Sequence, residues 1–127
     1  MKKKLTSMLA WTIVVASTAA SAHHGMSAYD FQRQIILKGT VTAFEFANPH
    51  VLLRFGVKDR GGKVIEWVAE TGSPNMMRRG GWTKGSVKPG DEITVSGHPA
   101  KDGSASMRFM KIVLANGQEL DPASGFK

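Results

Sequence analysis

The sequence predicts an all-β domain with one short helix, arranged as an OB-like five-stranded antiparallel barrel with Greek-key connections. Two observations lead to this prediction. Five segments of strand length are separated by turn residues, and one short helical segment lies between the third and the fourth. Small all-β domains tend to close into barrels, because an open sheet leaves unpaired edges.

The N-terminal segment has the three parts of a secretory signal peptide. Lys2-Lys3-Lys4 precede an apolar run of nine residues, Met8 to Ala16, and Ala20-Ser21-Ala22 matches a cleavage site. The run is shorter than the roughly 20 residues that a membrane-spanning helix needs. We therefore expect residues 1–22 to be removed during export to the periplasm, which leaves a mature protein without a membrane span.

The mature chain of 105 residues suits one domain with a modest core. Without the three signal-peptide lysines it keeps 14 Lys and Arg against 10 Asp and Glu, a net charge of +4. These charges are scattered, whereas nucleic-acid-binding proteins usually cluster their basic residues. A nucleic-acid partner is also not expected in the periplasm. The absence of cysteine excludes a disulfide scaffold, a thiolate zinc site and a cysteine nucleophile.

Residues 23–33 form a lead-in, which either frays or contacts the domain through Tyr29 and Phe31. Residues 34–47 are rich in β-branched and aromatic side chains and predict a long first strand. Gly39 within this strand indicates a bulge or a sharp bend. A bent first strand is typical of the OB fold, where it takes part in both halves of the sheet.

The second and third strands are predicted over residues 50–58 and 63–71, with a hairpin loop at residues 59–62. Asn48-Pro49 marks the turn before them. Strict alternation in the second strand predicts one inward face, made of Val51, Leu53, Phe55 and Val57.

A short helix is predicted over residues 75–79, because Ser73 is a good cap and Pro74 suits the first helical position. Met76 and Met77 are expected to plug the open bottom of the barrel. The last strands are predicted over the segments 92–97, 105–114 and, as a short addition, 118–120. The barrel domain thus spans residues 34–121, and residues 122–127 form a C-terminal tail.

Five motifs resemble those of a family of small exported bacterial proteins catalogued as a domain of unknown function. They are His23-His24-Gly25, Leu37-Lys38-Gly39-Thr40-Val41, Asn48-Pro49-His50, Gly72-Ser73-Pro74-Asn75 with Arg79-Gly80-Gly81-Trp82-Thr83, and Lys88-Pro89-Gly90-Asp91 with Lys101-Asp102-Gly103. The resemblance covers about 90 residues and implies a single exported β-barrel domain with no established activity. This chain has a second glycine where the family has a simple Arg-Gly-Trp.

Four histidines are the candidate metal ligands: His23, His24, His50 and His98. Cleavage after Ala22 would place a free α-amine on His23, and this amine and the imidazole of the same residue form a chelate. A second imidazole, from His50 or His98, would complete a three-nitrogen site. Nitrogen donors suit Cu(II), so copper is the metal that this set favours, although another divalent ion also fits.

Two further readings of these residues remain open. Met26 can add a thioether for Cu(I), and an exposed Met76–Met77 pair would do the same. Alternatively, the histidines are polar loop residues with structural hydrogen bonds, in which case His50 would bond to the turn at Asn48.

A different binding role is predicted by a cationic and aromatic surface on the strands. Arg54, Trp67 and Lys38 could recognise an anionic ligand, a saccharide or a partner protein, as OB folds do on their β-face. A catalytic role is not expected. Glu66 and Glu70 share a strand face, but nothing in the sequence places them in a cleft, and no nucleophile motif surrounds Ser73. The sequence therefore predicts a periplasmic binding or accessory protein.

Overall fold

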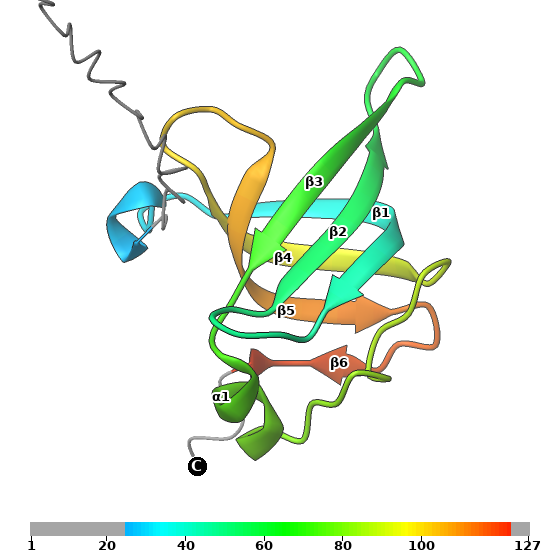
Figure 1. The fold of residues 1–127 in the computed structure, drawn as a ribbon. Coiled ribbons are helices and arrows are strands. Elements are labelled where there is room, and N and C mark those ends of the chain that lie inside the picture. The colour runs from blue at the N-terminus through cyan, green and yellow to red at the C-terminus, as the bar shows by residue number, and fades with distance from the viewer. Residues whose placement is uncertain (1–24, 123–127) are drawn as a thin grey trace, which may run out of the picture.

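Five strands close into a barrel and a sixth short strand extends it (Figure 1). The computed structural model describes residues 25–122, so the predicted signal peptide lies outside the described residues. The elements in chain order are η1 (Met26–Ala28), β1 (Ile35–Glu45), β2 (Leu52–Lys58), β3 (Val64–Glu70), α1 (Pro74–Arg79), β4 (Glu92–Pro99), β5 (Ser106–Leu114) and β6 (Glu119–Leu120). Every predicted strand and the predicted helix are present within about two residues of the expected bounds.

Strand β1 takes part in both halves of the barrel, as predicted. Its first half, residues 35–40, pairs with β4, and its second half, residues 40–45, pairs with β2. Gly39 lies at the crossing point, where a Cβ atom would be 2.4 Å from the carbonyl oxygen of Gly56. The bulge itself lies two residues later, between Val41 and Ala43, so Gly39 allows close strand contact rather than forming the bulge.

The prediction of an entirely antiparallel barrel was wrong in one pairing. Four neighbouring pairs are antiparallel, but β3 and β5 pair in parallel through Val68–Ser106, Ala69–Met107 and Glu70–Arg108. The reason is geometric. Strand directions cannot alternate all the way round a closed ring that has an odd number of strands, so one neighbouring pair must be parallel.

The core lies inside the barrel and is closed at one end by α1 (Figure 1). The predicted alternation of the second strand is confirmed, because Val51, just before β2, and Leu53 and Phe55 within it are fully buried, and Val57 packs against the core. Trp82 is buried after the helix, and its indole N–H donates to the carbonyl oxygen of Asp121 over 3.3 Å.

Of the two methionines predicted to plug the barrel, helix α1 buries only Met77. The Ser73 hydroxyl accepts a hydrogen bond from the Met76 N–H and caps the helix, as predicted. Met77 is 1% exposed and belongs to the core, whereas Met76 is 40% exposed. Neighbouring helical residues point about 100° apart, so a single-layer plug uses only one of them. Gly81 ends this segment with a φ of +84°, a conformation that favours glycine.

The lead-in is anchored to the β4–β5 turn rather than frayed. Tyr29 forms a β-bridge with Ala100, and the Lys101 N–H donates to the carbonyl oxygen of Ala28 over 2.9 Å. Tyr29 is 4% exposed, which confirms its predicted contact with the domain. Within residues 25–122, no helix has the length and apolar character that crossing a membrane requires.

Candidate metal-binding site

Two adjoining cavities lie beside α1 and the end of β3. The first has a volume of about 340 Å³, and the second about 370 Å³. Gly72, Met76 and Arg108 line both of them. Of the four predicted histidine ligands, the structure describes His50 and His98, and each of these lines one of the two cavities.

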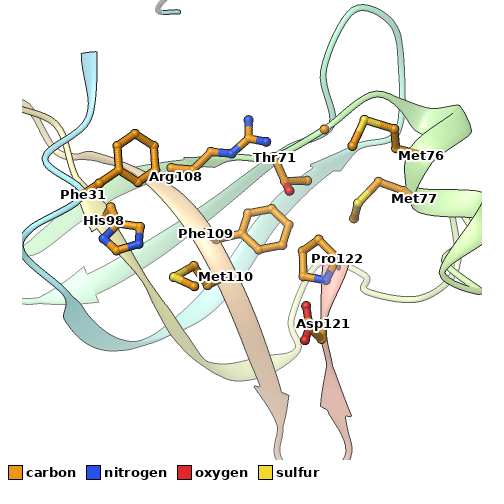
Figure 2. Close-up of a pocket in the computed structure, with 11 residues that line it drawn as sticks. Phe31, Thr71, Met76, Met77, His98, Arg108, Phe109, Met110, Asp121 and Pro122 are labelled. Carbon is orange, nitrogen blue, oxygen red and sulfur yellow. The ribbon is translucent and has the colours of Figure 1, made fainter. Parts of the chain in front are cut away.

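His98 lines the first cavity, together with Phe31, Phe109 and Met110 (Figure 2). Its Nδ1 lies 2.6 Å from the backbone carbonyl oxygen of Arg33, which can only accept, so Nδ1 carries the proton and donates. The ring packs against Phe31 with a centroid distance of 4.9 Å. His98 thus joins the lead-in to β4.

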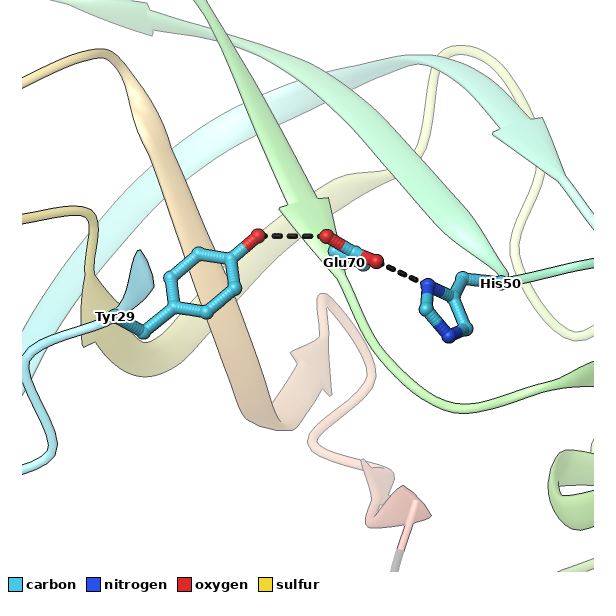
Figure 3. A network of polar contacts seen from close by, with 3 residues as sticks. All are labelled: Tyr29, His50 and Glu70. Atoms are coloured by element: carbon cyan, nitrogen blue, oxygen red, sulfur yellow. Dashed lines mark hydrogen bonds and ion pairs between the residues drawn. The ribbon is translucent and has the colours of Figure 1, made fainter. Parts of the chain in front are cut away.

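His50 lines the second cavity and belongs to a network of three residues (Figure 3). Glu70 ends β3 and lies between the other two. One carboxylate oxygen, Oε1, contacts His50 Nδ1, and the other, Oε2, accepts a hydrogen bond from the Tyr29 hydroxyl over 2.7 Å. The Glu70 side chain is 14% exposed. The network joins the lead-in, the β1–β2 loop and β3.

The contact with Glu70 determines what the His50 imidazole can do. A carboxylate accepts, so Nδ1 carries the proton, and in the neutral ring Nε2 keeps its lone pair. Figure 3 shows the second ring nitrogen on the side of the ring away from Glu70. The side chain is 40% exposed. Metal-ligating histidines are held by carboxylates in this way, with one nitrogen oriented and the other free for the metal.

Tyr29 keeps its proton in this network. Burial raises the pKa of the Tyr29 hydroxyl well above its ordinary value, and the hydrogen bond to Glu70 and the negative charge of Glu70 raise this pKa further. Tyr29 is therefore a permanent donor to Glu70 at physiological pH, and it fixes the carboxylate that orients His50.

The sequence missed the partner of His50. If His50 were only a loop residue with a structural role, its hydrogen bond would be expected at the Asn48 turn. The imidazole contacts Glu70 instead. The register of β2 and β3 brings them together, because Leu52 lies opposite Glu70. In the sequence, Glu70 stands out only as a carboxylate that shares a strand face with Glu66, which does not indicate the contact with His50.

The four predicted metal ligands do not all meet in the described part of the chain. His23 and His24 lie outside the described residues, and His50 and His98 line neighbouring cavities rather than one. Between residues 25 and 122 there is no group of three or more His, Asp, Glu or Cys side chains that could hold a metal ion. Gly25, however, lines the same cavity as His50, and it directly follows His24 in the sequence.

The predicted β-face residues are not brought together. Trp67 lies opposite the buried Phe55 and packs against the core. Arg54 precedes Phe55 in the strand, so its side chain points to the opposite face. There its guanidinium binds Glu45 over 2.7 Å and Glu66 over 3.6 Å, and the hydrogen bond to Glu45 raises the pKa of Arg54. Lys38 lines a separate cavity with Lys58 and Glu92.

Known structures with a similar fold are OB-fold proteins. The crystal structure of Rim1, the mitochondrial single-stranded DNA-binding protein of S. cerevisiae, aligns with a TM-score of 0.50 and 13% identity over 65% of this chain and 93% of that chain. A selenomethionine-labelled crystal of Rim1 gives a TM-score of 0.49 and 14% identity over 65% and 94%. At 13% identity the likeness to the first Rim1 structure shows the fold alone, and it confirms the predicted OB-like barrel.

The sequence relationship points to a family without an assigned activity. No curated protein matches the sequence closely enough to count as a relative. One family pattern matches residues 10–108, which include both cavity histidines and the Tyr29–Glu70 pair. The chain therefore belongs to DUF6152, a family of unknown function.

Proposed function

We propose that this protein is a small exported binding protein that takes up copper at His50, with nitrogen ligands from His23 and His24. One observation carries the proposal. Glu70 holds His50 by Nδ1, so that Nε2 stays available, and His50 lines a cavity whose wall includes Gly25, the residue after His24. This is the arrangement of a metal-binding imidazole supported by an outer carboxylate.

The distance along the chain suits such a site. His24 and His23 are one and two residues before Gly25, which lies in the cavity wall. An extended residue spans at most about 3.6 Å, so the chain length allows both side chains to reach the cavity. If the signal peptide is removed after Ala22, His23 supplies both its α-amine and its imidazole. Together with His50 these make three nitrogen donors, and the imidazole of His24 is a fourth; such nitrogen donors suit Cu(II).

The charges around the cavity permit a cation. Arg108 lines the cavity and disfavours a positive ion, but Glu70 lies beside Arg108 in the β3–β5 register. The carboxylate offsets the guanidinium charge and also polarises the imidazole toward the metal. Tyr29 donates to that carboxylate and keeps it in place.

The test begins with the full-length chain, exported by a Gram-negative host and carrying a C-terminal tag without histidine. Mass spectrometry of the purified protein identifies its first residue and so tests the signal-peptide prediction. Cu(II) is then titrated against a competing chelator, and the EPR spectrum is recorded. We expect nitrogen hyperfine structure and an affinity that falls in His50→Ala and in a variant extended by one glycine before His23.

His98→Ala is the matched control, because His98 is also a half-exposed cavity histidine bound by Nδ1 but lines the neighbouring cavity. This variant should keep the Cu(II) affinity. Glu70→Gln should lower the affinity by about 10- to 100-fold, as the loss of an outer carboxylate does elsewhere. Cu(II) binding that survives His50→Ala would mean only a chelate at the chain terminus, and the proposal would be abandoned.

A further inference from the structure

We infer that the His50 cavity is also a Cu(I) site, formed by the thioethers of Met26 and Met76 together with Nε2 of His50. The inference rests on the proposed function, because it names a second oxidation state of the same metal in the same cavity. It uses only residues that the structure describes. It therefore does not depend on His23 or His24.

The first support is the unusual exposure of these methionines. Met26 is 59% exposed and Met76 is 40% exposed, although methionine is usually buried. Both side chains line the cavity that contains His50. Two exposed methionines and an oriented imidazole therefore line one cavity of about 370 Å³.

The second support is that the Met76 thioether, the His50 imidazole and the backbone of Met26 are held in place. The Met76 thioether lies against Gly72, where a Cβ atom would be 3.1 Å from the sulfur and 3.3 Å from the methyl carbon. Burial of the adjacent Met77 fixes the rotation of the helix that presents Met76.

Met26 and His50 are held by the same network. Met26 belongs to η1, and its carbonyl oxygen accepts a hydrogen bond from the N–H of Tyr29 over 3.3 Å. The Tyr29 side chain in turn binds Glu70, which orients His50. The three donors thus come from η1, the β1–β2 loop and α1, and the barrel brings these segments to one place.

The chemistry of this donor set selects the ion. Thioether sulfur is a soft ligand that favours Cu(I), whereas Mg²⁺ and Ca²⁺ prefer oxygen. All three donors are neutral, and Arg108 adds a positive charge to the cavity wall. Glu70 offsets this charge, so the softness of the two sulfur donors selects the ion. A site with two thioethers suits Cu(I) better than Zn²⁺ or Cu(II).

The test compares variants under anaerobic conditions, with copper kept as Cu(I) by ascorbate and with bicinchoninate as the competing chelator. The variants are Met26→Leu and Met76→Leu, because leucine has a similar volume but no sulfur. Met110→Leu is the control, since Met110 is 47% exposed and lines the neighbouring cavity but not the His50 cavity. We expect each site variant to lose about tenfold or more in Cu(I) affinity, and the control to lose none.

A second readout observes binding in the wild-type protein and uses the variants to assign the resonances. The methyl groups of the methionines are labelled with ¹³C, and Ag(I) is added as a redox-inert substitute for Cu(I). Two methyl resonances should shift, and Met26→Leu and Met76→Leu should each remove one of them. His50→Ala should weaken the Ag(I) affinity as well.

The outcomes separate the two proposals. If Cu(I) affinity is unchanged in both methionine variants, or if the Met110 methyl shifts as much as the others, the inference is overturned. The proposed function survives this result if Cu(II) binding still requires His50. If Cu(I) binding follows Met26 and Met76 while Cu(II) binding ignores His50→Ala, the thioether site stands and the proposed nitrogen site is wrong.

Discussion

Replacing Tyr29 by phenylalanine tests the network that organises the site. Tyr29 is 4% exposed, and its hydroxyl donates to a carboxylate oxygen of Glu70 over 2.7 Å. Hydrogen bonds to a charged group contribute about 1.5–3 kcal/mol, so Tyr29→Phe should lower the free energy of unfolding by about 2 kcal/mol. For a domain of this size that corresponds to a fall in Tm of roughly 8–16 °C.

The effect should depend on pH with a definite sign. The folded-state pKa of Tyr29 is raised above its ordinary value of 10.0, so the stability that it contributes is complete below pH 10. Above pH 10 the tyrosine of the unfolded chain ionises while the folded one does not. The wild type then loses up to about 1.4 kcal/mol per pH unit. The difference between wild type and Tyr29→Phe should therefore shrink as the pH rises above 10.

Urea unfolding at pH 7 and at several values above pH 10 measures this difference. Tyrosine absorbance adds a direct readout, because the chain contains a single tyrosine. In a Glu70→Gln background the bond becomes neutral, and Tyr29→Phe should then cost only about 1 kcal/mol. A cost below about 0.5 kcal/mol at pH 7, or a cost that is the same in both backgrounds and at every pH, would refute the reasoning.

Three further predictions concern stability. Gly97→Ala should lower the free energy of unfolding in urea by about 1–3 kcal/mol or more, because its Cβ would lie 2.3 Å from the carbonyl oxygen of Arg108. Gly85→Ala is the control: its Cβ would have no neighbour closer than 3.8 Å, so the free energy of unfolding should hardly change. Met77→Ala should cost about 2–5 kcal/mol in thermal or urea unfolding, since the side chain is 1% exposed; a cost under 1 kcal/mol would contradict its role as the barrel plug. Arg54→Gln should cost at most about 1 kcal/mol, and this cost should fall with added salt, because both of its ion pairs are at the surface.

The network around Glu70 links the proposed function to stability. The same carboxylate anchors the lead-in through Tyr29 and orients His50. A metal that binds only the folded protein raises its stability in proportion to the logarithm of the metal concentration above Kd. Copper uptake should therefore also strengthen the attachment of the lead-in, and thermal unfolding with and without copper measures this coupling.

Local pattern determined most of the fold. Alternation put Val51, Leu53 and Phe55 on one face, and the order of strands and helix predicted the OB-like barrel. Ser73 and Pro74 located the start of α1, because capping and proline geometry act within a few residues. The sequence also marked His50 and Met26 as candidate ligands, since their chemistry is independent of the fold.

Contacts between distant residues were decided only by the tertiary structure. The parallel β3–β5 pair follows from closing five strands into a ring, which no single segment records. Glu70 meets His50 across 20 positions and Tyr29 across 41 positions, because strand register and the docked lead-in bring them together. Likewise, Met76 and Met77 are the same residue type in adjacent positions. Only the rotation of α1 against the barrel buries Met77 in the core and leaves Met76 exposed in the wall of the His50 cavity.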